Sequence, residues 1–129
     1  MNVLDHISLG VPDIEKARPF YDAALAPLGL NCLAANEGFA AYGIDAVQFL
    51  IMIPADGGDY TRGNGTHIAF RAGSSEAVDA FHARAIAAGG VCSGKPGPRP
   101  DYPANDVYAA FVIDPFGHKL EAIHNGFSA

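Results

Sequence analysis

Two stretches of sequence decide the fold of this chain: Leu4-Asp5-His6-Ile7-Ser8-Leu9 and Gly65-Thr66-His67-Ile68-Ala69-Phe70. They align without a gap at an offset of 61 residues. The same offset aligns further residues of matching character, namely Asp13 with Ser74, Phe20 with Phe81 and Gly29 with Gly90. Agreement at a fixed spacing over about 25 positions is typical of a duplicated structural unit. The chain therefore contains two copies of one unit.

Each copy opens with a strand and a helix. Alternating apolar and polar residues predict strands over 3–10 and 65–72. Asp13 is placed to cap a helix that runs to about Leu28 and ends at Gly29. In the second copy, the corresponding helix opens at Ser74 and closes at Gly89-Gly90.

Three further strands are expected after each helix. In the first copy they cover 30–35, 38–43 and 46–53, and in the second they lie near 90–94, over 107–113 and over 118–124. A Pro/Gly-rich segment from Lys95 to Pro103 is predicted to be a loop over a site.

The resulting order, βαβββ-βαβββ, predicts a fold of the α+β class. Two such modules can pair so that a curled mixed sheet surrounds a cavity, with the helices outside. We expect a single domain over residues 1–129, with module 1 at about 1–58 and module 2 at about 63–126.

Composition limits the classes of function. Half of the 129 residues are hydrophobic and 17% are charged, which favours a folded domain with a sizeable core. The net charge of −6 and the scattered basic residues argue against a nucleic-acid partner. No apolar run is long enough to span a membrane, and no export leader is recognised, so a cytoplasmic protein with reduced Cys32 and Cys92 is expected.

The two equivalent histidines are the first candidates for chemistry. If the apolar residues of the first strand of each module pack against the helices, His6 and His67 face the cavity. Glu121 interrupts an apolar strand between Leu120 and Ala122 and points to the same side. A carboxylate buried there is costly unless it is paired or bound to a cation.

Two imidazoles and one carboxylate form a facial triad with open coordination positions, which suits divalent Fe, Mn, Ni or Zn. The alternative is that both histidines are merely hydrogen-bonded and that Glu121 pairs with Lys119 or Arg71. Among the other histidines, His82 is expected to face solvent, and His118 and His124 to point away from Glu121.

The chain resembles the glyoxalase/bleomycin-resistance/extradiol-dioxygenase superfamily, which has the vicinal-oxygen-chelate fold. The resemblance is carried by the two repeated stretches that contain His6 and His67, and by Asp114-Pro115-Phe116-Gly117-His118-Lys119-Leu120-Glu121. The resemblance implies paired βαβββ modules, a divalent metal and a substrate bound through two adjacent oxygen atoms. The ligand positions of the family fall on His6, His67 and Glu121.

One departure from the family concerns a fourth ligand. Glyoxalase I enzymes usually supply a glutamate from the last strand of the first module. Alignment of residues 45–51 with 117–123 places Phe49 at that position, with Gln48 adjacent but out of register. This weakens the case for a two-base isomerisation.

The resemblance leads to a functional hypothesis with one alternative. The chain is expected to be a metal-dependent lyase, isomerase or ring-cleaving dioxygenase, in which Glu121 and Tyr108 act in catalysis and Tyr102 and Arg71 contact the substrate. The alternative is a bleomycin-resistance-type protein that binds a drug or another small molecule without catalysis. Fold analogy favours a homodimer. Whether the site lies within one chain or is shared between two remains open at this point.

Overall fold

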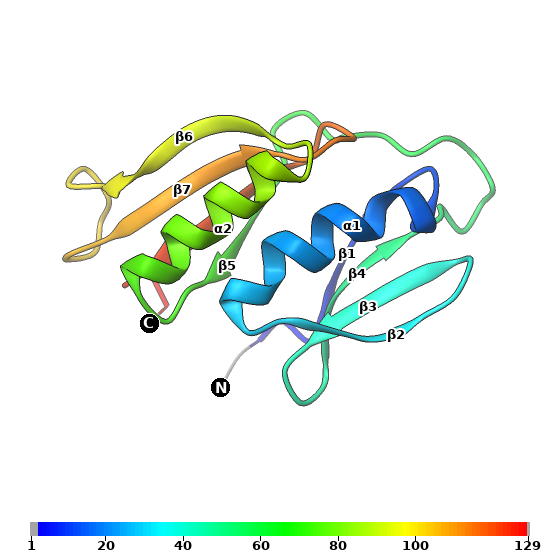
Figure 1. Cartoon of the computed structure of the whole chain (residues 1–129), viewed down its shortest axis with the longest axis horizontal. Coiled ribbons are helices and arrows are strands. Elements are labelled where there is room, and N and C mark those ends of the chain that lie inside the picture. Colours follow the sequence, from blue (N-terminus) through cyan, green and yellow to red (C-terminus); the bar gives the residue numbers. More distant parts are fainter. Residues whose placement is uncertain (1–2, 129) are drawn as a thin grey trace.

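The computed structural model describes residues 3–128 (Figure 1). The first module contains β1 (Ile7–Gly10), α1 (Ile14–Leu25), the short 3-10 helix η1 (Ala26–Leu28), β2 (Asn31–Ala35), β3 (Phe39–Gly43) and β4 (Val47–Met52). The second contains β5 (His67–Arg71), α2 (Ser75–Ala87), β6 (Val91–Pro98), β7 (Tyr108–Ile113) and β8 (Lys119–His124). The α+β class and the order of the elements are as predicted.

Each module forms its own four-stranded mixed sheet, and the two sheets share one topology. The strand orders are β1-β4-β3-β2 and β5-β8-β7-β6. In each sheet, the strand before the helix runs parallel to the last strand, and the other neighbouring strands are antiparallel. The duplication seen in the sequence is therefore also present in the sheet topology.

The helices begin where the sequence predicts, and the first one ends at Leu25, with the 3-10 helix η1 covering the remaining residues to Leu28. The Asp13 side chain accepts a hydrogen bond from Lys16 N at 2.9 Å, and the Ser74 hydroxyl accepts one from Ala77 N at 3.1 Å. These bonds satisfy backbone donors that lack partners in the first turn of a helix. Gly29 adopts a left-handed φ of 82° and ends η1.

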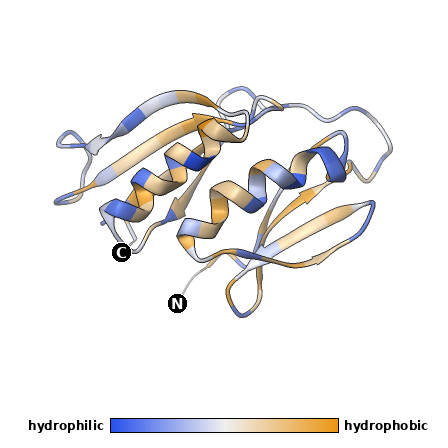
Figure 2. Ribbon diagram, in the orientation of Figure 1, coloured by the Kyte–Doolittle hydropathy of each residue, from blue (hydrophilic) through white to orange (hydrophobic). Residues whose placement is uncertain are grey.

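A single hydrophobic core joins the two modules. The helices lie side by side over the two sheets (Figure 1), and apolar residues recur along the strands and on both helices (Figure 2). At the junction, the rings of Phe49 from β4 and Phe70 from β5 meet edge to face, with their centroids 5.1 Å apart. Because both modules contribute to the same core, each stabilises the other.

Asp114 forms a second link between the modules. Its buried carboxylate accepts hydrogen bonds from the backbone of Phe116 at 2.9 Å and of His118 at 2.7 Å, and from the hydroxyl of Tyr21 on α1. Burial raises the pKa of Tyr21 well above its usual value, and the Asp114 carboxylate raises it further. His118 Nε2 lies 2.6 Å from the carbonyl oxygen of Gly10. The Asp-Pro-Phe-Gly turn thus ties the last hairpin of module 2 to module 1.

This link leads to a prediction about stability. We expect Asp114→Ala to lower the free energy of unfolding by about 3 kcal/mol, because buried donors on both modules lose their acceptor. Urea denaturation measures the change. Asp59→Ala, which removes an exposed carboxylate, serves as the control and should change the free energy by less than about 0.5 kcal/mol. Equal stabilities of the two variants would contradict this account of Asp114.

Strand β6 is longer than the sequence indicates. It extends to Pro98, so the first residues of the expected loop Lys95–Pro103 belong to a strand. The reason is that β6 lies at the edge of its sheet, where a proline can occupy a position whose N–H would not face a neighbouring strand.

Neither helix in the described part of the chain has the length and apolar character needed to cross a bilayer.

Candidate metal centre

The second sheet buries one face and turns the other away from the helices. Ile68, Phe70, Leu120 and Ala122 pack into the core beneath the helices. Since side chains alternate along a strand, His67 and Glu121 lie on the opposite face, as the sequence predicts. We call this opposite face, defined by His67, Ala69, Phe111, Lys119 and Glu121, the outer face of the second sheet.

Glu121 and His67 form a close pair on this outer face. Glu121 Oε1 lies 3.1 Å from His67 Nε2. The Glu121 residue is only 3% exposed, whereas 45% of the His67 side chain is exposed. Glu121 Oε2 is buried and has no hydrogen-bond partner among residues 3–128. A carboxylate oxygen in this state is costly unless a cation or a donor reaches it, so the pair fits a metal ion.

His6 does not join this pair within one chain. Its Nδ1 lies 2.6 Å from Asp5 Oδ1, and its side chain is 55% exposed. Across the described residues, no three His, Cys, Asp or Glu side chains converge closely enough to hold a metal ion. The expectation that His6, His67 and Glu121 face one cavity is therefore not met in a single chain. The helices lie over a core shared by both modules, and the other face of each sheet points away from that core (Figure 1).

The structure corrects the position of the missing fourth ligand. Ser8 and Ala69 occupy equivalent positions in the two modules. Ser8 pairs with Leu50 across the first sheet, and Ala69 pairs with Glu121 across the second. Leu50, rather than Phe49, is therefore the counterpart of Glu121. Phe49 faces the helices and is buried against aromatic residues of the core. The absence of a carboxylate at this position still holds, because Leu50 is apolar.

Of the two tyrosines predicted at the site, only Tyr102 lies beside Glu121. Burial raises the pKa of Tyr102, and the nearby Glu121 carboxylate raises it further. The Tyr108 hydroxyl instead donates to Asp79 Oδ1 of α2 at 2.6 Å. Tyr108 therefore lies on the helix side of the sheet, opposite to Glu121, and its placement gives no support to a catalytic role.

Arg71 shares the alternation of His67 along β5, but its guanidinium is already engaged. Its Nη2 donates to the carbonyl oxygen of Ser128 at 2.9 Å. Arg71 therefore helps to fix the C-terminal segment, while its Nη1 and Nε form no hydrogen bond among the described residues. Glu121 pairs with neither Arg71 nor Lys119, so the simple ion pairs considered from the sequence do not form among the described residues.

The remaining histidines lie away from the Glu121–His67 pair. His118 and His124 bond to backbone carbonyl oxygens, at 2.6 Å to Gly10 and 3.1 Å to Ala72. The prediction that His82 faces solvent is wrong in part, because its Nε2 is buried without a partner in the described chain. Burial accordingly lowers the pKa of His82.

Three further residues surround the pair: Phe111 and Arg99, which sequence reasoning missed, and Lys119, which it considered only as an ion-pair partner of Glu121. The Phe111 ring lies opposite Glu121 on β7, with its centroid 6.1 Å from that of His67. The Lys119 ammonium lies 5.0 Å, and the Arg99 guanidinium 5.9 Å, from the Phe111 centroid. Counting by twos from Glu121 along β8 would have found Lys119. Phe111 and Arg99 depend on strand register, which the sequence does not reveal.

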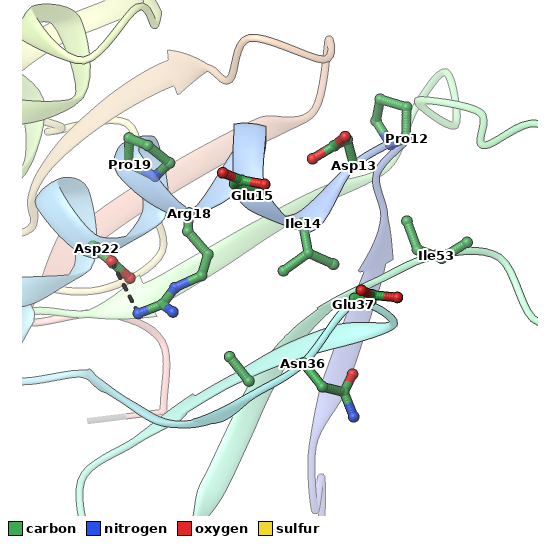
Figure 3. A pocket seen from close by; sticks show the side chains of 11 residues that line it. Pro12, Asp13, Ile14, Glu15, Arg18, Pro19, Asp22, Asn36, Glu37 and Ile53 are labelled. Carbon is green, nitrogen blue, oxygen red and sulfur yellow. Dashed lines mark hydrogen bonds and ion pairs between the residues drawn. The ribbon is translucent and has the colours of Figure 1, made fainter.

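A cleft of about 710 Å³ lies elsewhere, between the start of α1 and the β2–β3 turn (Figure 3). Its polar lining includes Glu15, Glu37 and Arg18, whose Nη2 lies 3.3 Å from Asp22 Oδ2. All of its lining residues belong to module 1. The cleft is therefore separate from the Glu121–His67 pair.

Comparison with known proteins gives consistent results. Residues 3–122 match the model of the Glyoxalase/Bleomycin resistance protein/Dioxygenase superfamily. A glyoxalase/bleomycin resistance protein from Albidiferax ferrireducens T118 is 39% identical, with a TM-score of 0.85 over 97% of this chain and 100% of that one. A glyoxalase-related enzyme from Fulvimarina pelagi has a TM-score of 0.74 at 21% identity, over 97% of this chain and 89% of its own, and so shares the fold. No curated protein matches the chain.

Proposed function

Because the chain belongs to the Glyoxalase/Bleomycin resistance protein/Dioxygenase superfamily, we propose that it is a divalent-metal-dependent enzyme acting on a small substrate chelated through two vicinal oxygens. The buried Glu121 carboxylate carries this proposal, because one of its oxygens meets His67 and the other has no partner among the described residues. A buried carboxylate of this kind is stable only when positive charge compensates it.

Glu121 and His67 would supply two ligands to the ion. This donor set of a carboxylate and an imidazole suits Fe, Mn, Ni or Zn. When bound, such an ion supplies positive charge that stabilises negative charge on a chelated substrate. Since Leu50 occupies the position equivalent to Glu121, module 1 offers no carboxylate there, and more of the coordination sphere is left to the substrate.

We propose that His6 of a second copy of the chain completes the site. In one chain His6 is exposed, and the neighbouring apolar residues Val3 and Leu4 are 93% and 67% exposed. Exposed apolar residues of this kind favour a protein–protein contact. In a two-fold symmetric homodimer every contact occurs twice, so two equivalent sites of His6, His67 and Glu121 would form.

Tyr102, which lies beside the outer face, would orient the substrate, and the chain around it would exclude water. A tyrosine hydroxyl is protonated at neutral pH, and the raised pKa of Tyr102 is consistent with a place beside the Glu121 carboxylate, where it could donate a hydrogen bond. The chain after β6 also covers part of this sheet, since Tyr102 and Ala104 pack against Val107, Ala109 and Ile123. This small apolar cluster shields the carboxylate from bulk water.

Metal analysis tests the proposal. The purified chain, after incubation with Fe, Mn, Ni or Zn salts and removal of the excess, is expected to retain about one ion per chain. Metal retention at trace level with all four ions would contradict the proposed function. A substrate panel of catechols and hemithioacetals, assayed with the metal-loaded protein, then distinguishes ring cleavage from lyase or isomerase chemistry.

A further inference from the structure

The outer face of the second sheet carries a feature that metal binding does not use. We propose that Lys119 and Arg99, which flank the Phe111 ring, form a subsite for a carboxylate group of the substrate. This inference rests on the proposed function. It adds that the substrate is an acid whose carboxylate is distinct from the two oxygens held at the metal.

The subsite adjoins the proposed metal ligands directly. Lys119 is the cross-strand partner of His67, and Phe111 is the cross-strand partner of Glu121. Directly opposed residues of an antiparallel pair, such as Phe111 and Glu121, have their Cβ atoms about 4.5–5.5 Å apart. Lys119 Nζ lies 5.0 Å from the Phe111 centroid, so these side chains share one small area. A compact ligand held by His67 and Glu121 would therefore lie within reach of Lys119.

The two cations are not neutralised by neighbouring carboxylates. Among residues 3–128, neither Lys119 nor Arg99 takes part in an ion pair. Lys119 is exposed and stands over the Phe111 ring, with Nζ 5.0 Å from the centroid. Two unpaired cations beside one aromatic ring outnumber Glu121, the carboxylate of the outer face, so this area is positive in a chain with a net charge of −6.

Arg99 is held in place by backbone atoms rather than by a charged partner. Its Nη1 donates to Gly97 O at 3.0 Å, and its Nη2 donates to Lys95 O at 2.8 Å. These bonds orient the guanidinium without cancelling its charge. Its centre stays 5.9 Å from the Phe111 centroid. Arg99 is thus ordered before any ligand arrives, which lowers the entropic cost of binding.

Gly94 of β6 makes room for the Phe111 ring, and Gly97 lies beside Arg99. A Cβ at Gly94 would lie 3.0 Å from Phe111 Cδ2 and 3.5 Å from Arg99 Nη2. A Cβ at Gly97 would lie 3.5 Å from Arg99 Nη1. The Phe111 ring can therefore lie close against β6 because Gly94 has no side chain, whereas a Cβ at either glycine would be in ordinary van der Waals contact with the Arg99 guanidinium. The glycines, the ring and the cations together form an ordered feature of the sheet.

The chemistry of these groups favours an anionic group such as a carboxylate. A lysine ammonium is a compact charge, and charge-assisted bonds to a carboxylate are about twice as strong as neutral ones. A neutral diol gains nothing from the two cations, and a cationic substrate is repelled by them. The preferred substrate class is therefore a small acid with two vicinal oxygens.

Matched pairs of probes test this inference with the zinc-loaded protein. The acids are 2,3- and 3,4-dihydroxybenzoate, and the neutral counterparts are the corresponding dihydroxybenzamides, which keep the same vicinal oxygens. Isothermal titration calorimetry is expected to show that at least one acid binds about tenfold more tightly than its amide. Lys119→Met should remove most of that preference and leave the affinity for the amide within about twofold, whereas Lys119→Arg should retain the preference.

Lys16→Met is the matched control, because it removes an exposed lysine from α1 and should leave the preference intact. If wild-type protein binds acids and amides equally, or if Lys119→Met keeps the full preference, the carboxylate subsite is wrong and the proposed function stands. If neither acids nor amides bind the zinc-loaded protein, the vicinal-oxygen function itself fails, and the subsite fails with it.

Discussion

Glu121→Gln is expected to abolish the stabilisation of this protein by divalent metal ions. In wild-type protein, a metal present at 1,000 times its dissociation constant should raise the free energy of unfolding by about 4 kcal/mol. The variant should gain almost none of this, because a neutral amide replaces the buried carboxylate that meets His67. Urea denaturation of each protein, with and without Zn, measures the difference.

In the metal-free state, Glu121→Gln should leave the free energy of unfolding nearly unchanged or should raise it. Replacing the charge removes the cost of a buried carboxylate whose Oε2 lacks a partner in the described chain. Metal-free Glu121→Gln should therefore be at least as stable as metal-free wild type. Glu37→Gln, which alters an exposed carboxylate in the β2–β3 turn, is the control and should keep the full metal-dependent gain. A Glu121→Gln variant that keeps this gain would exclude Glu121 as a ligand.

The second large effect concerns sites shared between two chains. His6→Ala and Glu121→Gln homodimers are each expected to lose their bound metal. If the two variants are unfolded, mixed in equal amounts and refolded, about half of the dimers will contain one chain of each kind. Each mixed dimer has one intact site, made of His6 from the Glu121→Gln chain and His67 with Glu121 from the His6→Ala chain. Metal analysis should therefore recover about one quarter of the wild-type content.

The control for this experiment mixes two variants of the same module. His67 and Glu121 come from one chain in every proposed site, so a mixture of His67→Ala and Glu121→Gln has no intact site in any dimer. It should recover no metal. If His6→Ala mixed with Glu121→Gln also recovers none, while refolded wild type recovers its metal, His6 does not complete the site from a second chain.

Local sequence predicted that His67 and Glu121 share one face of the second sheet but not the alignment of the two modules. Strand alternation was sufficient for His67 and Glu121, because their apolar neighbours distinguish the two faces of β5 and β8. On β4 no such contrast exists, since Phe49 and Leu50 are both apolar. There the register is set by pairing with β1, and an error of one residue exchanges the two faces.

The separation of His6 from Glu121 could not be read from the repeat. The duplication shows that His6 and His67 are equivalent within their modules, but it contains no information on how the modules pack. That packing depends on contacts between distant residues, such as Phe49 with Phe70 and Tyr21 with Asp114. The prolines after Lys95 likewise predict a loop, because prolines are tolerated in a strand only at the edge of a sheet. The sequence does not show that β6 is an edge strand, since the order of strands is a property of the whole sheet.

The hydrogen bond between Tyr21 and Asp114 also constrains the order of events during synthesis. The two residues are 93 positions apart. At ordinary translation speeds, the ribosome needs roughly 5–20 s to reach Asp114 after it has made Tyr21. During that interval the Tyr21 hydroxyl cannot donate to the Asp114 carboxylate. In the same way, Phe49 cannot pack against Phe70 until Phe70 has been made. The nascent first module therefore remains incomplete, with apolar surface open to chaperones, until the last hairpin has left the ribosome.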